Sequence, residues 1–116
     1  MKSFNTANLG IQQGSRTLFS DFVNDGPMWL GKGNRSVYST IEFAEPFGQI
    51  PVVHATIGMW DMDHEHNIRA DLSVTQITAK GFTVKFSTWA DSRVARVRVD
   101  WMAIGGITND DHWDIS

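Results

Sequence analysis

Three features of the chain offer the groups that a ligand rich in hydroxyls requires. Arg69 can donate several hydrogen bonds in fixed directions, and Trp89 presents an aromatic face that packs on C–H groups. Gly31 and Gly33 bracket a single residue, so a ligand can approach the backbone of this loop closely. A sugar presents adjacent hydroxyls, a face of C–H groups and, when acylated, a carbonyl. The three features together match the chemistry of sugar binding.

Each feature also has an ordinary structural interpretation. Arg69 could be a solvated charge, or the ion-pair partner of Asp71 or Asp91. Trp89 could pack against a neighbouring loop or against another protomer, where an indole often completes an interface. The glycine loop could be a plain surface connection. Residue types alone leave these alternatives open.

The densest polar segment of the chain, from Trp60 to His66, could hold a metal. Asp61 and Asp63 would suit calcium, and the histidines would suit zinc. However, the segment lacks the loop glycine and closing glutamate of an EF-hand, and His64 and His66 would point to opposite faces of an extended chain. We favour a solvated hairpin loop, and we expect no metal and no other cofactor.

No motif for catalysis accompanies these groups. The sequence contains no Gly-x-Ser-x-Gly, no phosphate-binding loop and no zinc-protease motif. Four carboxylates, Asp61, Asp63, Asp71 and Asp100, show no spacing that selects an acid–base pair. We therefore expect a binding protein and not an enzyme.

Composition narrows the remaining classes. The 116 residues predict a single domain, and a net charge of −3 gives no basic excess for nucleic-acid binding. No apolar run is long enough to span a membrane, and the first residues do not form a signal peptide. The absence of cysteine excludes disulfides and suits synthesis in a reducing cytoplasm. The sequence leaves the final location unknown.

The longest regular stretch lies between Gly81 and Ile104. Residues 82–89 alternate strictly, with phenylalanine and valine on one face, and residues 95–103 repeat the pattern on the return. We predict two antiparallel strands joined as a hairpin by a short turn at residues 90–92. Trp89 has the parity of the polar face, so something must cover it.

Further alternating runs complete an all-β prediction. Asn8 to Gln13 and Thr17 to Val23 flank a predicted turn at residues 14–16, and strands follow over residues 36–43, 52–60 and 67–75. No segment has helical periodicity. We predict a single-domain antiparallel β-sandwich of about six strands over residues 1–116, ending in an acidic tail at 108–116 whose Trp113 is either loose or docked on a neighbour.

The long stretch, GFTVKFSTWADSRVARVRVDWMAI, resembles the H-type lectin domain, the carbohydrate-binding module of several agglutinins and of discoidin C-terminal domains. The resemblance continues upstream through IEFAEPFGQIPVVHATIGMWDMD and NIRADLSVTQITAKGF, and residues 36–104 match best. It implies a six-stranded β-sandwich that assembles as a trimer or as a dimer of trimers. It also implies that N-acetylgalactosamine or galactose binds in clefts between neighbouring subunits.

The resemblance assigns roles to individual residues. Arg69 matches the family's sugar-binding arginine, Trp89 its binding-site tryptophan, and Gly31 the loop glycine near the acetamido group. Two positions depart from the family. Ala90 replaces a histidine that can contact sugar, and Gly33 or Asn34 takes the place of a loop aspartate that bonds sugar hydroxyls. We expect Asp25 or Asp91 as a possible substitute for that carboxylate.

Charged residues on the polar parity of neighbouring strands have two interpretations. They form either a solvated face with cross-strand pairs or a seam between subunits around a three-fold axis, and the resemblance favours the seam. These residues are Arg93, Arg96, Arg98, Asp71 and Asp100. The leading function is a glycan-binding lectin. The alternative is a non-enzymatic structural or attachment subunit, of a cell envelope or virus-like particle, with lost or altered sugar binding.

Overall fold

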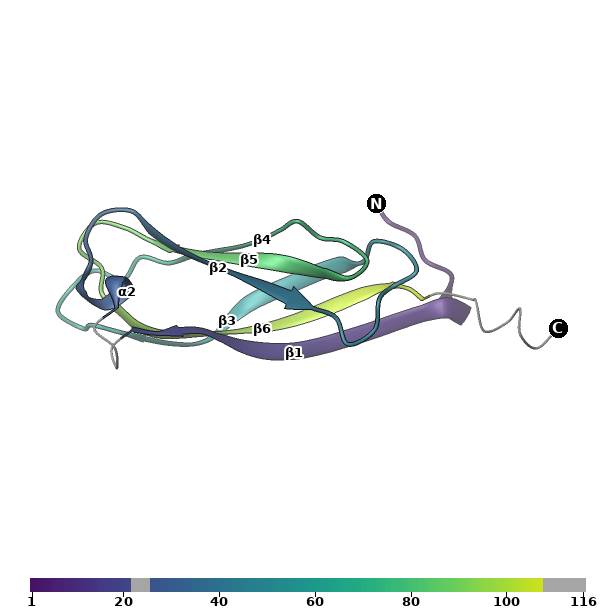
Figure 1. The fold of residues 1–116 in the computed structure, drawn as a ribbon, viewed down its shortest axis with the longest axis horizontal. Helices are drawn as coiled ribbons and strands as arrows, with labels where there is room; N and C mark the ends of the chain where they lie inside the picture. The colour runs from purple at the N-terminus through teal and green to yellow at the C-terminus, as the bar shows by residue number, and fades with distance from the viewer. Residues whose placement is uncertain (22–25, 108–116) are drawn as a thin grey trace.

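The computed structural model describes residues 1–21 and 26–107 and contains two antiparallel sheets of three strands each (Figure 1). One sheet has the order β1-β6-β3 and the other the order β2-β5-β4. The strands are β1 Leu9–Ser20, β2 Arg35–Glu42, β3 Val52–Met62, β4 Asp71–Thr75, β5 Gly81–Thr88 and β6 Val94–Gly106. The described elements also include two short helical turns, η1 Thr6–Asn8 and α2 Pro27–Leu30. The predicted six-stranded all-β sandwich is confirmed.

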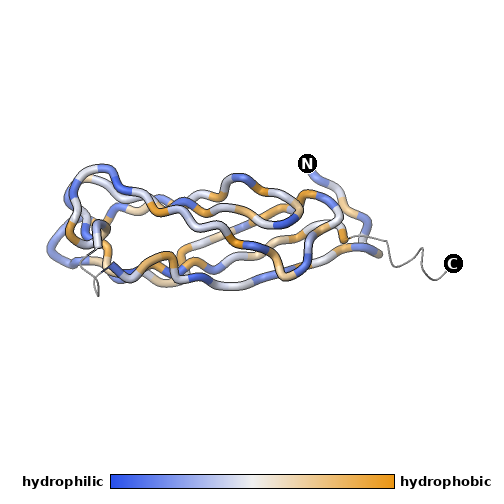
Figure 2. Tube along the Cα trace, in the orientation of Figure 1, coloured by the Kyte–Doolittle hydropathy of each residue, from blue (hydrophilic) through white to orange (hydrophobic). Residues whose placement is uncertain are grey.

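The core lies between the two sheets and consists of the side chains that the alternation placed on the apolar faces. Phe82 and Phe86 of β5 meet Val97 and Val99 of β6, and each is at most 1% exposed. Trp101 of β6 packs against this core, with its ring centroid 5.3 Å from that of Phe82. Full burial of such a side chain stabilises the fold by about 1.5–3 kcal/mol. Figure 2 shows apolar and polar residues alternating along both sheets.

The predicted hairpin between residues 81 and 104 is wrong in its pairing. β5 pairs with β2 and β4, whereas β6 pairs with β1 and β3, so the two strands lie in different sheets. Both strands carry one strongly apolar face, and placing these faces opposite each other across the sandwich buries both. The turn at residues 90–92 is therefore a corner between the sheets, and Ala90 adopts a φ of 56° within it.

The hairpin predicted around Gly14 is also wrong, because β1 runs through it as one strand of 12 residues. Gly14 lies opposite Trp101 of β6, and a Cβ at position 14 would lie 3.0 Å from that indole ring. The glycine provides room for an aromatic side chain on the neighbouring strand instead of forming a turn. Residues 22 and 23, the end of the predicted second strand, lie outside the described residues.

Two local predictions fail at shorter elements. β4 begins at Asp71 and not at Asn67, and Ile68, inside the strand predicted over residues 67–75, is 55% exposed. A single helical turn, α2, replaces the irregular connection expected before Gly31, with Pro27 at its first position, where a missing N–H does least harm. Asp25 and the tail with Trp113 fall outside the described residues, so their predicted roles stay predictions.

Candidate binding site

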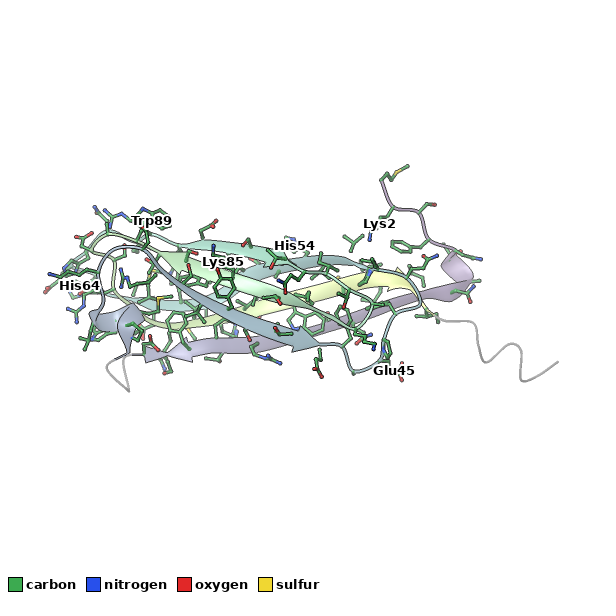
Figure 3. All side chains as sticks on the ribbon, turned by 45° about the horizontal axis from the view of Figure 1, so that its top comes forward. Lys2, Glu45, His54, His64, Lys85 and Trp89 are labelled. Atoms are coloured by element: carbon green, nitrogen blue, oxygen red, sulfur yellow. The ribbon has the colours of Figure 1, made fainter. Side chains whose placement is uncertain are left out.

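Three chain segments meet at the end of the sandwich where β5 passes into β6, around the labelled Trp89 in Figure 3. The amide of Gly33 donates to the Ala90 carbonyl (2.9 Å), which joins the α2–β2 loop to the corner. The Thr88 hydroxyl donates to the Arg69 carbonyl (2.7 Å), which joins the segment before β4. These bonds bring residues predicted from separate parts of the sequence to one place.

Arg69 and Asp91 form the centre of this site. Arg69 Nη1 donates to Asp91 Oδ1 at 2.6 Å and to the Ser92 hydroxyl at 3.1 Å. Arg69 is thus the partner of Asp91, one of the alternatives that the sequence left open. Within the described residues, Nε and Nη2 of Arg69 and Oδ2 of Asp91 form no hydrogen bond to another residue, so donors and an acceptor remain for a ligand.

Electrostatics keep this pair charged. The hydrogen bond from Arg69 is the main cause that lowers the pKa of Asp91. The Arg69 side chain is 23% exposed and that of Asp91 57%, so solvent reaches both. Ser92, which is 1% exposed, donates its hydroxyl to the Asn67 carbonyl. This bond fixes the Ser92 oxygen that accepts a hydrogen bond from Arg69. A fixed, solvent-accessible donor–acceptor pair suits adjacent hydroxyl groups.

Trp89 follows directly on the last residue of β5. Its polar parity indicated that something must cover the indole, and within this chain Trp89 remains 40% exposed. Figure 3 shows it at the same end of the sandwich as His64, far from Lys2 and Glu45. The exposed ring offers an apolar surface beside the turn that holds Asp91.

The glycine loop is held in place by contacts within the chain. The Gly31 amide donates to the Pro27 carbonyl (2.7 Å), and a Cβ at this position would collide with that oxygen. Gly33 has a φ of 74°, which favours glycine. Both glycine amides therefore already donate within the chain, and the exposed groups of the loop are the side chains of Lys32 and Asn34.

Arg35 joins the segments around the site, and this role was not predicted from the sequence. Its guanidinium donates to five backbone carbonyls, and burial lowers its pKa. The acceptors are Gly33 (3.1 Å), Pro27 (3.3 Å), Met28 (3.1 Å), Ala90 (3.3 Å) and Ser92 (2.7 Å). One signal was present in the sequence, because Arg35 has the inward parity of Val37 and Ile41. A charged residue at such a position needs partners inside the fold.

The polar segment after β3 forms an internal network. Asp63 accepts from the Glu65 amide (2.9 Å), contacts His66 Nδ1 (2.9 Å) and pairs with Arg93 (3.5 Å). The Glu65 amide is the largest cause that lowers the pKa of Asp63. Arg93 also stacks on the Trp29 ring at 4.3 Å. Across residues 1–21 and 26–107, no three His, Asp, Glu or Cys side chains are grouped to hold a metal ion.

Four of the five candidate seam residues, Arg93, Arg96, Arg98 and Asp100, form ion pairs within the chain. Arg96 contacts Asp61 at 2.8 Å across β6 and β3, and Arg98 contacts Asp100 at 3.1 Å along β6. Cross-strand pairing is thus present, and the seam between subunits stays a prediction.

Comparison with known proteins identifies relatives in sequence and in structure. The H-type lectin domain matches residues 39–104. A protein of Fuscovulum blasticum called ATP synthase subunits region ORF 7 is 49% identical over 109 residues, covering 94% of this chain and 95% of that one. A discoidin-1 polypeptide of Dictyostelium discoideum is 31% identical over 74 residues, covering 63% of this chain and 29% of the relative.

Solved structures of discoidin II from Dictyostelium discoideum share the fold. The native recombinant protein superimposes with a TM-score of 0.74 at 23% identity, over 93% of this chain. The wild-type protein gives 0.72 at 24% identity, over 86% of this chain. This chain spans 40% and 38% of those two chains.

The fold is a two-sheet antiparallel β-sandwich with a cluster of polar side chains at the end where β5 passes into β6. The chain belongs to the H-type lectin domain family, as the match over residues 39–104 shows. The predicted family is confirmed, and membership supports carbohydrate binding in general. Among the described residues, no helix has the length and apolar character needed to cross a membrane.

Proposed function

We propose that this protein is a lectin that binds sugars through Arg69, Asp91 and Trp89. The observation that carries the proposal is the Arg69–Asp91 pair at 2.6 Å, which leaves unused donors and an acceptor beside an exposed indole. Adjacent hydroxyls of a sugar would accept from Arg69 and donate to Asp91, and its C–H face would pack on Trp89. Asp91 thereby takes the role of the carboxylate that the glycine loop lacks.

The proposed ligands are terminal N-acetylgalactosamine and galactose, bound in clefts between the subunits of a trimer. The site of one chain is shallow and leaves Trp89 partly uncovered, which supports completion by a neighbouring copy. The outer face of the β1-β6-β3 sheet carries four exposed apolar side chains, Leu9, Ile11, Val52 and Met102, which would gain from burial against another copy. Several sites on one oligomer would bind clustered glycans with avidity.

A second candidate is a structural or attachment protein that has lost sugar binding. One observation favours it, because the amides of Gly31 and Gly33 are both used within the chain and cannot bond an acyl group without rearrangement. Family membership and the lectin neighbours favour a binding protein over an enzyme in either case.

A glycan-array screen of the unaltered protein beside Arg69→Ala and Trp89→Ala tests the proposal. Two variants serve as matched controls. Arg96→Ala breaks the surface ion pair between Arg96 and Asp61 in the β1-β6-β3 sheet, and Trp60→Ala removes another exposed indole. We expect binding of galactose-type termini that both site variants lose and both controls keep. A folded protein that binds no glycan would overturn the lectin proposal and favour the structural role.

Light scattering of the same samples tests the assembly separately. We expect three copies, or six for a dimer of trimers, at micromolar concentration. A monomer that still binds sugar would refute the inter-subunit cleft while leaving the roles of Arg69 and Trp89 intact.

A further inference from the structure

A second hollow adjoins the Arg69–Asp91 pair and shares Asp91 with it. This cavity, of about 240 Å³, lies between the glycine loop and the segment after β3. It is lined by Leu30, Gly31, Lys32, His66, Asp91 and Arg93. A sugar held at Arg69 and Asp91 would therefore have one of its substituents next to this cavity.

Positive charge dominates the cavity and its immediate surroundings. Lys32, Arg93 and Arg69 carry three positive charges, and the carboxylates that neutralise them are those of Asp63 and Asp91. Glu65 lines a different hollow, together with Trp29 and Asp61. The local surplus contrasts with the net charge of −3 for the whole chain.

Lys32 supplies the unused charge. Within the described part of the chain, its ammonium group has no hydrogen-bond or ion-pair partner, and the residue is exposed. His66 is bonded to Asp63 only through Nδ1, which leaves Nε2 available in the same part of the chain. Both groups can therefore engage a ligand without breaking a bond of the fold.

The position of Lys32 is fixed by its neighbours. On one side the Gly31 amide is bound to the Pro27 carbonyl, and on the other the Gly33 amide is bound to the Ala90 carbonyl. Arg35 Nε also donates to the Gly33 carbonyl at 3.1 Å. A backbone anchored on both sides holds the lysine beside the cavity, so less conformational freedom is lost when a ligand binds.

We propose that the cavity between Lys32, His66 and Arg93 binds an anionic substituent, a carboxylate or a sulfate, of the sugar held by Arg69 and Asp91. The ligand class is therefore acidic glycans, and this inference rests on the proposed lectin function. Lys32 contributes the charge that is free to pair, and Arg93 and His66, which also line the cavity, add donors.

Titration calorimetry with matched monosaccharides tests the inference. Galactose, galacturonic acid and galactose 6-sulfate share one ring configuration and differ in charge and in the anionic group. We expect one or both acidic sugars to bind about threefold to tenfold more tightly than galactose at low ionic strength, the gain of one or two exposed ion pairs. The preference should largely vanish at about 1 M salt, where the Debye length is about 3 Å.

Charge variants locate the effect. Lys32→Gln should remove most of the preference for the acidic sugar, and Lys32→Glu should reverse it. Lys80→Gln is the matched control, because Lys80 precedes β5 at the other end of that strand from Trp89. The control should leave the preference unchanged.

The outcomes separate this inference from the lectin proposal. Equal binding of galactose and both acidic sugars, abolished by Arg69→Ala, would overturn the anionic site and leave the lectin function standing. A preference that Lys32→Gln and Lys80→Gln reduce equally would also overturn it, since the effect would come from total charge. Binding of neither neutral nor acidic sugars would overturn both proposals.

Discussion

Replacement of Arg35 by methionine should loosen the whole binding end of the sandwich. The methionine keeps most of the length of the side chain and its apolar stem but removes every donor to the surrounding backbone. The α2 turn, the glycine loop and the β5–β6 corner would each lose a bond to this residue. Because no other side chain among the described residues donates to all three segments, we expect them to separate together.

The distances give the magnitude. The bonds from Arg35 to the carbonyls of Ser92, Met28 and Gly33 are 2.7, 3.1 and 3.1 Å long, whereas the two others, at 3.3 Å, are weak. A bond to a charged group contributes about 1.5–3 kcal/mol, but bonds of one side chain are not additive and solvent replaces some of them. We expect a loss of about 3 kcal/mol, or a Tm lowered by roughly 10–15 °C for a domain of this size.

Thermal unfolding followed by circular dichroism measures this loss, with Arg96→Met as the control. Arg96 has one partner on an exposed surface, so its replacement should cost about 1 kcal/mol or less. Sugar affinity should fall in the Arg35 variant, although Arg35 lies behind the site. A Tm decrease no larger than that of the control would refute the assignment of Arg35 as the residue that holds the site together.

Three further changes test the loop, the core and the acidic network. Gly31→Ala should lower the Tm and weaken sugar binding, because its Cβ would collide with a backbone carbonyl oxygen that cannot move freely; unchanged binding would show that the loop adapts. Phe86→Ala, at a fully buried core position, should cost about 3–5 kcal/mol in denaturant unfolding, and a cost near 1 kcal/mol would contradict the packing described for β5. The pKa of Asp63 is lowered from 3.8, so its stabilising effect is complete above that pH and is lost as the pH falls through the lower folded-state pKa. Asp63→Asn should reduce the slope of stability against pH below 3.8, and an unchanged slope would exclude Asp63 as a source of it.

Alternation predicted which face of each strand is buried, but it could not predict the neighbours of each strand. The parity of Phe82 and Val97 is the same whether β5 and β6 pair or face each other, because one apolar face satisfies either arrangement. β5 and β6 face each other across the sandwich because this arrangement buries the apolar faces of both strands together. That burial depends on the complete sandwich and cannot be seen in either strand alone. Gly14 gave a similar ambiguity, since a glycine marks both turns and close approaches.

The candidate site could be predicted where a residue type carries its own chemistry. Arg69 and Trp89 were selected from their side chains and from the family resemblance, and Asp91 was one of the partners considered for Arg69, which the 2.6 Å contact confirms as its partner. Arg35 was missed because its role depends on carbonyls from separated segments, and a sequence does not show which carbonyls will need donors. For the same reason, the sequence did not show that the Gly31 amide bonds to the Pro27 carbonyl and the Gly33 amide to the Ala90 carbonyl.

The pairing of β1 with β6 also governs when the protein can fold during synthesis. Leu9 lies opposite Gly106, so β1 can form its sheet only after β6, the last strand, has been synthesised. Contacts of such long sequence separation slow folding, and until β6 leaves the ribosome the edge of β1 lacks its hydrogen-bonding partner strand. The proposed site at Arg69, Trp89 and Asp91 lies just before β6, at the corner that joins the two sheets. Because β6 follows this corner in the chain, the sheet on one side of the proposed site closes only after the last strand has been made.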